Sequence, residues 1–295
     1  MAFRFQKKQS VKKAIRRLGW ERTRQALRCL DEIEDLEAIH RVRKNIKKLR
    51  ALLRLVKGKV PRRDYRRATG ALQRAAAPLA GPRDAHVKQQ ALEKLLDHFG
   101  GQVSKSEFRP IGRELEKRWG EEMRRFNERR SGETIRAVFI RLSRYLMDLP
   151  IDGKGWTLVA PGIRTAYRAG RRQYRAVVKE GSADQLHRWR KRVKDLWYQV
   201  RLLRPIFPEQ VRALSAELKD LGEYLGEVHD LVLLKETVSR RKDDHAKAVE
   251  ALGALIDRRR TELCLAALDL GSRIYTEKPQ AFCRRLAHYW KSWRD

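Results

Sequence analysis

The chain has 295 residues, of which 69 are Lys or Arg and 37 are Asp or Glu, so its formal net charge at pH 7 is +32. A charge of this size destabilises the compact state by self-repulsion and indicates a polyanionic partner, such as nucleic acid, an anionic membrane surface, an acidic protein or a phosphate polymer. The composition excludes a disulfide-rich domain, and no apolar run reaches the roughly 18 to 20 residues of a membrane span.

The first predicted helix follows a basic N-terminal segment. Residues 1–20 contain no acid, as in an organellar transit peptide, but Val11, Ile15 and Leu18 have helical spacing and favour a helix of the fold. There is no secretory h-region, so we expect a cytoplasmic protein. The helix has a thin basic face, which is either solvated surface or part of an anion site. This face consists of Arg17, Arg24 and Arg28.

The second predicted helix carries the strongest pattern in the chain. Ile39, Val42, Ile46 and Leu49 fall on one apolar face, and a cationic stripe runs beside this face rather than opposite it. Residues 40–57 contain eight Lys or Arg and no Asp or Glu, so no i,i+4 ion pair can form among them. An anion site therefore accounts for the stripe better than a solvated face does. The stripe consists of His40, Arg43, Lys44, Lys47 and Arg54, with Arg50 at its edge.

Periodicity stays helical along the rest of the chain, which predicts an all-α fold with helices of roughly 15 to 25 residues. Helix breaks are predicted at Pro61, at 78–82, at 100–101, at 131–132, at 205–208 and at Pro279. The richest break is 150–156, near the midpoint. We therefore place two units at residues 1–150 and 151–295.

A second basic segment follows this midpoint, and its pattern repeats the first half. The block Leu186-His-Arg-Trp-Arg-Lys-Arg-Val-Lys-Asp-Leu196 matches Ile39-His-Arg-Val-Arg-Lys-Asn-Ile-Lys-Lys-Leu49 without a gap. The chain is therefore interpreted as two versions of one helical unit. The second stripe consists of His187, Arg190, Lys191, Lys194 and Arg201. A further basic face, consisting of Arg164, Arg168, Arg171 and Arg175, precedes it and is expected beside the stripes.

A shorter motif recurs downstream of each block, as Leu79-Ala-Gly-Pro-Arg-Asp84 and Leu225-Gly-Glu-Val-His-Asp230. Both segments are expected to be turns that open helices, with Asp84 and Asp230 as N-caps or as partners that orient a stripe arginine. Arg83 is the expected anion contact of this motif, and His229 replaces it in the second half.

Two further residue types have alternative roles. His40 and His187 are helix caps or core hydrogen-bonding groups in one interpretation, and imidazoles that donate to phosphate in the other. Neither has a metal ligand at i+3 or i+4, so we expect no metal site and no cofactor. The three cysteines have no C-x-x-C spacing and are expected to be reduced thiols in the core. They are Cys29, Cys264 and Cys283.

The doubled I/L-H-R-x-R-K-x-I/V-K block, the two L-x-x-x-R/H-D motifs and the duplicated length resemble the conserved-histidine α-helical domain family, called CHAD. The resemblance implies two helical bundles related by a pseudo-two-fold axis, with a basic central cavity that binds inorganic polyphosphate. It also implies that the stripe residues above are the ligands, and that association with polyphosphate granules is to be expected.

Two other functions stay open. A nucleic-acid binder is the alternative, and Trp197, Tyr198 and the pair Tyr167 and Tyr174 are the aromatic residues that would stack bases. A phosphohydrolase is less favoured, because the chain has no phosphate-binding glycine loop and no strand that alternates Glu and Lys. We therefore expect a protein that binds a polyanion and is not an enzyme, of unknown oligomeric state.

Overall fold

The structure is a computed structural model that describes residues 3–32, 36–239 and 246–295. Within these ranges the chain forms eleven α-helices and two short 3-10 helices and no strand, so the predicted all-α fold is confirmed. The helix breaks predicted at Pro61, 100–101, 131–132 and Pro279 all fall between helices or at a helix start.

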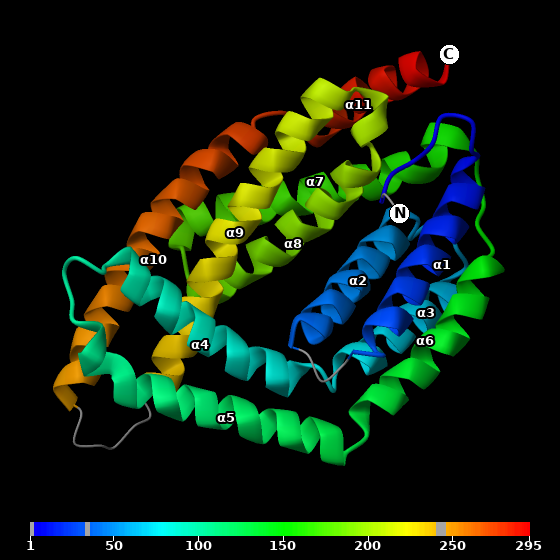
Figure 1. Ribbon diagram of the computed structural model, residues 1–295. Coiled ribbons are helices and arrows are strands. Elements are labelled where there is room, and N and C mark those ends of the chain that lie inside the picture. Colours follow the sequence, from blue (N-terminus) through cyan, green and yellow to red (C-terminus); the bar gives the residue numbers. More distant parts are fainter. Residues whose placement is uncertain (1–2, 33–35, 240–245) are drawn as a thin grey trace.

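Six helices belong to the first half. They are α1 (Val11–Cys29), α2 (Leu36–Leu55), α3 (Arg62–Ala76), α4 (Ala80–His98), α5 (Arg109–Glu128) and α6 (Ser131–Met147), with the 3-10 helix η1 (Lys105–Phe108) before α5. In Figure 1, α1, α2, α3 and α6 form one bundle, and the α4–α5 hairpin extends from it toward α10. Apolar residues at helical spacing fill the bundle, such as Ile15, Leu18 and Ile46, each at most 2% exposed.

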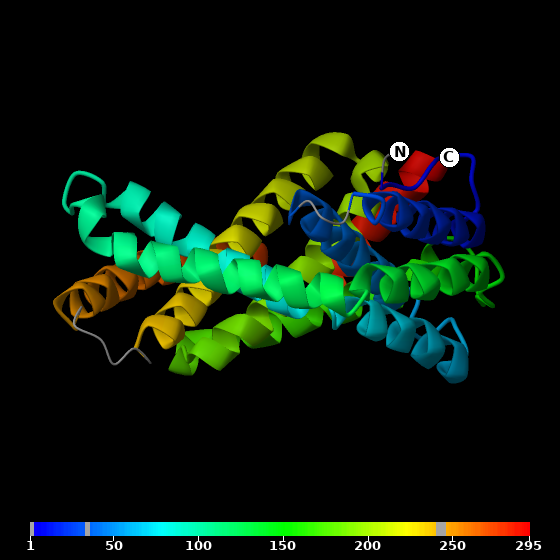
Figure 2. The ribbon, with the colours of Figure 1, turned by 60° about the horizontal axis from the view of Figure 1, so that its bottom comes forward.

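Five helices belong to the second half. They are α7 (Gly155–Glu180), α8 (Ala183–Leu202), α9 (Pro208–Val238), α10 (Ala246–Ile274) and α11 (Pro279–Arg294), with η2 (Arg204–Ile206) before α9. The helix α8 packs between α7 and α9, α10 packs on α9, and α11 packs on α7. Figure 2 shows that the whole molecule is an elongated slab.

The two halves meet along α2 and α8. Arg43 lies near Arg190, Lys47 lies near Lys194, and the Gln199 amide donates to the Ala51 carbonyl at 3.4 Å. Positions of α2 therefore face positions of α8 about 147 residues later, so the two helices run side by side in the same direction. This arrangement brings the two predicted cationic stripes together.

One predicted turn is wrong. The segment Leu225–Asp230 lies inside α9, a helix of 31 residues that is longer than the predicted range. Gly226 has a packing position in this continuous helix rather than a turn position. It is buried against α8, where the side-chain atom nearest to an added Cβ would be Arg190 Nε at 3.5 Å. In the first half, Pro82 lies in the first turn of α4, where its missing N–H costs nothing, and this segment does open a helix.

The helix α7 crosses close to the end of α2, and this contact leads to a prediction about stability. A Cβ added to Gly162 would lie 2.1 Å from the Leu55 carbonyl oxygen, which is backbone and cannot rotate away. We expect Gly162→Ala to lower the free energy of unfolding by about 2 to 3 kcal/mol, because the helices must separate. Chemical denaturation with helical circular dichroism measures this.

The matched control is Gly253→Ala in α10, where an added Cβ meets nothing within 4 Å. Alanine should stabilise this helix by about 0.5 to 1 kcal/mol relative to glycine. If both variants changed stability by the same amount, the close contact of α7 with α2 would not be a determinant of the fold.

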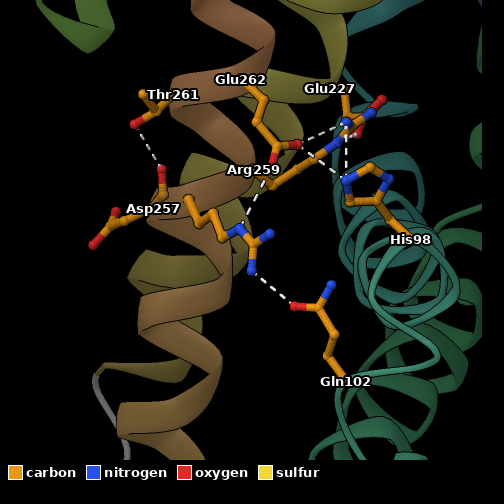
Figure 3. Close-up of polar contacts among 8 residues, drawn as sticks. His98, Gln102, Glu227, Asp257, Arg259, Thr261 and Glu262 are labelled. Carbon is orange, nitrogen blue, oxygen red and sulfur yellow. Dashed lines mark hydrogen bonds and ion pairs between the residues drawn. The ribbon is translucent and has the colours of Figure 1, made fainter.

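A polar network joins the α4 end of the hairpin to the second half (Figure 3). The Arg259 guanidinium of α10 donates to Glu227 of α9 at 2.7 Å and to Glu262 at 3.1 Å, and Glu262 is 3.0 Å from His98 Nε2 of α4. The Arg258 guanidinium donates to Gln102 at 2.8 Å. These contacts fix the position of α4, which carries Arg83 at its other end.

Candidate functional site

The two stripe helices bury the apolar faces that the sequence predicted. Ile39, Val42, Ile46 and Leu49 of α2 are at most 2% exposed, and in α8 the side chain of Trp189 is fully buried. Since each stripe lies beside its apolar face, the contact between α2 and α8 places cations from both halves close together.

Five cations form what we call the central cationic cluster: Arg43 and Lys47 of α2, Arg83 of α4, and Arg190 and Lys194 of α8. All five side chains are half-buried. The sequence predicted each of them as an anion ligand, and the structure brings them together from three helices. Lys44 lies at the edge of the cluster, near Lys194.

Arg83 is held at the centre of the cluster by two carboxylates. Its guanidinium donates to Asp84 at 2.8 Å and to Asp230 at 3.2 Å, and the Arg83 side chain is only 16% exposed. Asp230 lies inside α9 and therefore caps no helix, and the N-cap position of α4 is Leu79 rather than Asp84. The N-cap interpretation is thus wrong for both residues, which instead orient Arg83, the predicted anion contact of the same motif.

Two glycines of α9 lie against the stripe of α8, and the absence of a Cβ at Gly222 makes room for Lys194. A Cβ added to Gly222 would lie 2.8 Å from Lys194 Nζ, and one added to Gly226 would lie 3.5 Å from Arg190 Nε. The two glycines are four residues apart, as Arg190 and Lys194 are, so each cation passes over a glycine. The cations can therefore lie close to the helix backbone and lose much of their hydration.

Burial and mutual repulsion weaken the positive charge of the cluster in the free protein. Burial, followed by the charges of Arg190 and Arg43, lowers the pKa of Lys47 to about 7. Burial and Arg190 lower the pKa of Lys194 to about 8. Burial and Arg83 lower the pKa of Arg43 to about 10. A bound polyanion would reverse the part of these shifts that comes from repulsion between the cations, while the part that comes from burial would remain.

The histidines lie at the rim of the cluster. The rings of His187 and His229 are 4.1 Å apart, and burial, then His187 and Arg190, lowers the pKa of His229 to about 3. Burial and Lys191 lower the pKa of His187. Partial burial of the imidazole and the charge of Lys47 lower the pKa of His40, against an opposing effect of Glu37. Both predicted histidines are therefore neutral near pH 7 without a ligand.

Three predicted ligands of the two stripes lie outside the central cationic cluster and contact other groups. The Arg50 guanidinium donates to the Leu72 carbonyl at 3.2 Å, and Arg201 lies over the Trp197 ring at 5.0 Å. Arg54 forms a hydrogen-bonded ion pair with Asp195, which is buried in α8. Arg54 thus links α2 to α8.

The Arg54–Asp195 pair makes a second stability prediction. Asp195→Asn removes the carboxylate charge and leaves Arg54 and Arg192 without it, so we expect the free energy of unfolding to fall by about 1 to 3 kcal/mol. Thermal and chemical denaturation measure the loss. Asp184→Asn in the same helix is the control, because its pair with Arg188 is exposed, and it should change stability by less than about 0.5 kcal/mol. Equal effects would show that the buried pair does not stabilise the junction.

The structure does not bring the arginines of α1 and α7 into the cluster. Arg24 and Arg28 are exposed, and Arg17 is bound to Glu21 at 2.8 Å. The expectation that the α7 arginines lie beside the stripes is wrong for two of them. Arg164 lines a cleft with α11, and Arg171 donates to the Tyr275 carbonyl at 2.9 Å, because this face of α7 is turned toward α10 and α11. The remaining two, Arg168 and Arg175, are exposed.

The sequence interpretation missed Arg22 and Lys48, which extend the cationic region toward α1. Both are buried, and burial, then Arg22 and Arg201, lowers the pKa of Lys48 to about 8. The signal for Arg22 was available, because it lies four residues after Leu18 and four before Ala26, on the buried face of α1. A charged residue at such a position indicates a specific role.

A cleft of about 360 Å³ lies beside the cluster, between α4 and α5. Its lining includes Asp84 and Lys88 of α4, and Arg118 and Glu122 of α5. This cleft therefore carries both signs of charge, and a purely basic central cavity stays a prediction. Among the described residues, no helix is long and apolar enough to cross a membrane. The cysteines form no disulfide, and Cys29 is buried whereas Cys264 and Cys283 are half-buried.

Cationic helices from the two halves of the chain therefore meet within an all-helical fold. The protein is of the class that holds a partly desolvated cationic site between helices. The family model of the CHAD domain matches residues 17–239, and the chain belongs to this family. The fold is similar to that of the CHAD domain from the plant Ricinus communis, with a TM-score of 0.71 at 16% identity, over 94% of this chain and 95% of that one. It is also similar to PptA from Streptomyces chartreusis, with a TM-score of 0.67 at 13% identity, over 91% of this chain and 100% of that one. No curated protein matches the sequence.

Proposed function

We propose that the chain binds inorganic polyphosphate at the central cationic cluster. The observation that carries this proposal is that five cations from α2, α4 and α8 come together. Two carboxylates lie beside them, and both bind Arg83. A phosphate chain offers closely spaced negative charges and many acceptor oxygens, which suit arginine forks and lysine amines. The family to which the chain belongs is associated with this ligand.

The arrangement of aromatic residues favours polyphosphate over nucleic acid. Proteins that bind single strands stack bases on accessible aromatic rings. Trp189, Tyr198 and Tyr167 are at most 4% exposed. The half-buried Trp197 is covered by Lys194 at 4.7 Å and by Arg201 at 5.0 Å. The cluster therefore offers charge without a surface for base stacking.

We also propose that the role is binding rather than hydrolysis. Cleavage of a phosphoanhydride needs a positioned base or metal ion. The carboxylates at the cluster, Asp84 and Asp230, both accept hydrogen bonds from the Arg83 guanidinium, and this ion pairing makes each a weaker base. Incubation with polyphosphate and Mg²⁺ should therefore release no phosphate. A protein with this function would be expected in the cytoplasm at polyphosphate granules.

The proposal is tested by titrating the protein, at about 150 mM salt, with medium-chain polyphosphate and with single- and double-stranded oligonucleotides of matched charge. We expect polyphosphate to bind at least about 10-fold more tightly than either oligonucleotide. Its negative charges are more closely spaced than those of a nucleic acid, and its binding does not depend on stacked bases. Equal competition by oligonucleotides would contradict the proposal and make the chain a general polyanion binder.

A further inference from the structure

The ε-amine of Lys47 has an unusual environment even within the cluster. Arg43 precedes it by one turn on α2, Arg83 approaches from α4, and Arg190 and Lys194 approach from α8. In the part of the chain that the structure describes, no carboxylate forms an ion pair or hydrogen bond with this amine. The side chain is half-buried, so the amine is still reachable from solvent.

The acids nearest to this group do not compensate its charge. Asp84 and Asp230 both form ion pairs with the Arg83 guanidinium, so their charges are compensated by this arginine. His40 lies two helical turns earlier on α2, and its pKa is lowered, so its imidazole carries no charge that could compensate Lys47. The positive form of Lys47 is therefore repelled from several sides and attracted from none.

The consequence is an amine that is largely in its free-base form near neutral pH. With a pKa of about 7, about three quarters of Lys47 is neutral at about pH 7.5, against about one in a thousand for an ordinary exposed lysine. A neutral amine is a nucleophile, and a lysine placed beside other cations is activated in this way. The three guanidinium groups around it attract phosphoryl oxygens.

We propose that Lys47 is a site of acylation by acyl phosphates, which are small electrophiles that carry their own phosphate. The cluster would hold the phosphoryl group against Arg43, Arg83 and Arg190 and place the acyl carbon beside the amine. This inference rests on the proposed function only in requiring that the cluster attracts phosphoryl groups. It does not require that polyphosphate is the preferred ligand.

The reaction needs no further reagent. The lone pair of the neutral Lys47 amine attacks the acyl carbonyl carbon, and a C–N bond forms. The bond between that carbon and the bridging oxygen breaks, and inorganic phosphate leaves with the electron pair. The proton that the amine loses passes to this phosphate. The product is an uncharged amide at Lys47, which removes one cation from the cluster and would weaken the binding of any polyanion there.

Neighbouring lysines are less suited to this reaction. The Lys194 amine lies 4.7 Å from the centre of the Trp197 ring, a position that favours the charged form, and Glu223 also favours this form. Lys48 is buried, with its amine 5.9 Å from the centre of the Phe3 ring. Lys47 is half-buried rather than buried, is repelled by the surrounding cations and lies beside three arginines. The proposal therefore predicts that this lysine is acylated selectively.

The test is incubation of the full chain with acetyl phosphate near neutral pH, followed by mass spectrometry of proteolytic peptides that resolves positions 47 and 48. We expect Lys47 to be acetylated at least about 10-fold faster than the exposed Lys117 and Lys179, which serve as internal references. Inorganic pyrophosphate in excess should suppress labelling of Lys47 and leave the references unchanged.

A second acetylating reagent without a phosphate distinguishes two causes of fast labelling: binding of the phosphoryl group by the arginines, and the reactivity of the amine itself. An uncharged acetyl N-hydroxysuccinimide ester cannot use the arginines, so the ratio of Lys47 to Lys179 labelling should be lower with the ester than with acetyl phosphate. Labelling of Lys47 at the rate of the references, in a sample that binds polyphosphate normally, would overturn the inference and leave the proposed function intact. Selective labelling of Lys47 without polyphosphate binding would support the inference and contradict the proposed function.

Discussion

The double variant Lys47→Ala/Lys194→Ala should lose most of its affinity for polyphosphate while staying helical. The two amines come from opposite halves of the chain and lie near Arg190, so a bound phosphate chain would contact both. A hydrogen bond to a charged group contributes about 1.5 to 3 kcal/mol, so losing two should weaken binding on the order of 100-fold or more. Calorimetric titration of the wild type and the variant in the same salt measures this.

The control has the same change in net charge at a distance from the cluster. Lys117→Ala/Lys179→Ala removes two exposed amines of α5 and α7. At about 150 mM salt, charges further than about 8 Å from the ligand are largely screened, so the control should bind within about 3-fold of the wild type. If both double variants lost affinity equally, the polymer would be bound by overall charge, and the cluster would not be the site.

The sequence was sufficient to predict the fold class and the core of the candidate site. Helical spacing identified the buried faces of α2 and α8, and the angle between face and stripe placed Arg43, Lys47, Arg190 and Lys194 beside the contact. This works because the position of a side chain around a helix depends only on its own sequence number. Arg83 was also predicted, from the second motif.

The sequence could not predict which neighbour covers each helical face. The arginines of α7 form a face as regular as the stripe of α8, but Arg171 is turned toward Tyr275, a contact across 104 positions of the chain. Arg54 lies on the stripe at the predicted angle, yet its partner is Asp195 of the other half. Such assignments depend on how helices pack, which periodicity does not encode.

The continuity of α9 illustrates a second limit of sequence interpretation. Glycine and aspartate together indicate a turn when they are judged locally. In α9, Gly222 and Gly226 instead face the cations of α8, and Asp230 binds Arg83 from within the helix. The physical role of these residues lies in a contact between helices, so the local pattern predicted a turn where tertiary packing keeps a helix.

Polyphosphate binding should be accompanied by proton uptake at about pH 8. The free protein holds Lys47 with a pKa of about 7 and Lys194 with a pKa of about 8, both below the value of 10.5 for an unperturbed lysine. A polyanion restores both pKa values toward 10.5, so about one to two protons should be bound on complex formation at this pH. Calorimetry in buffers of different ionisation enthalpy measures the number directly.

The sign of the pH dependence follows from the same linkage. Between about pH 7 and pH 10 the complex holds more protons than the free protein, so affinity should fall as pH rises through this window. Free-protein stability should change in the opposite direction, because there the unfolded chain binds more protons at its lysines than the folded chain does. Arg43, with a pKa of about 10, loses its proton only at the upper end of this window, and Glu223 beside Lys194 opposes the shift only in part.

The double variant Lys47→Ala/Lys194→Ala distinguishes this origin of the protons from others. Terminal phosphates of the polymer and the histidines at the rim also titrate, but their contribution stays in the variant. His229, with a pKa of about 3, and His187, whose pKa is also lowered, would take up protons on binding in more acidic solution. If the wild type and the variant took up the same number of protons at about pH 8, the two amines would already be charged in the free protein. The cluster would then be less desolvated than its geometry indicates, and the activated amine at Lys47 would lose its physical basis.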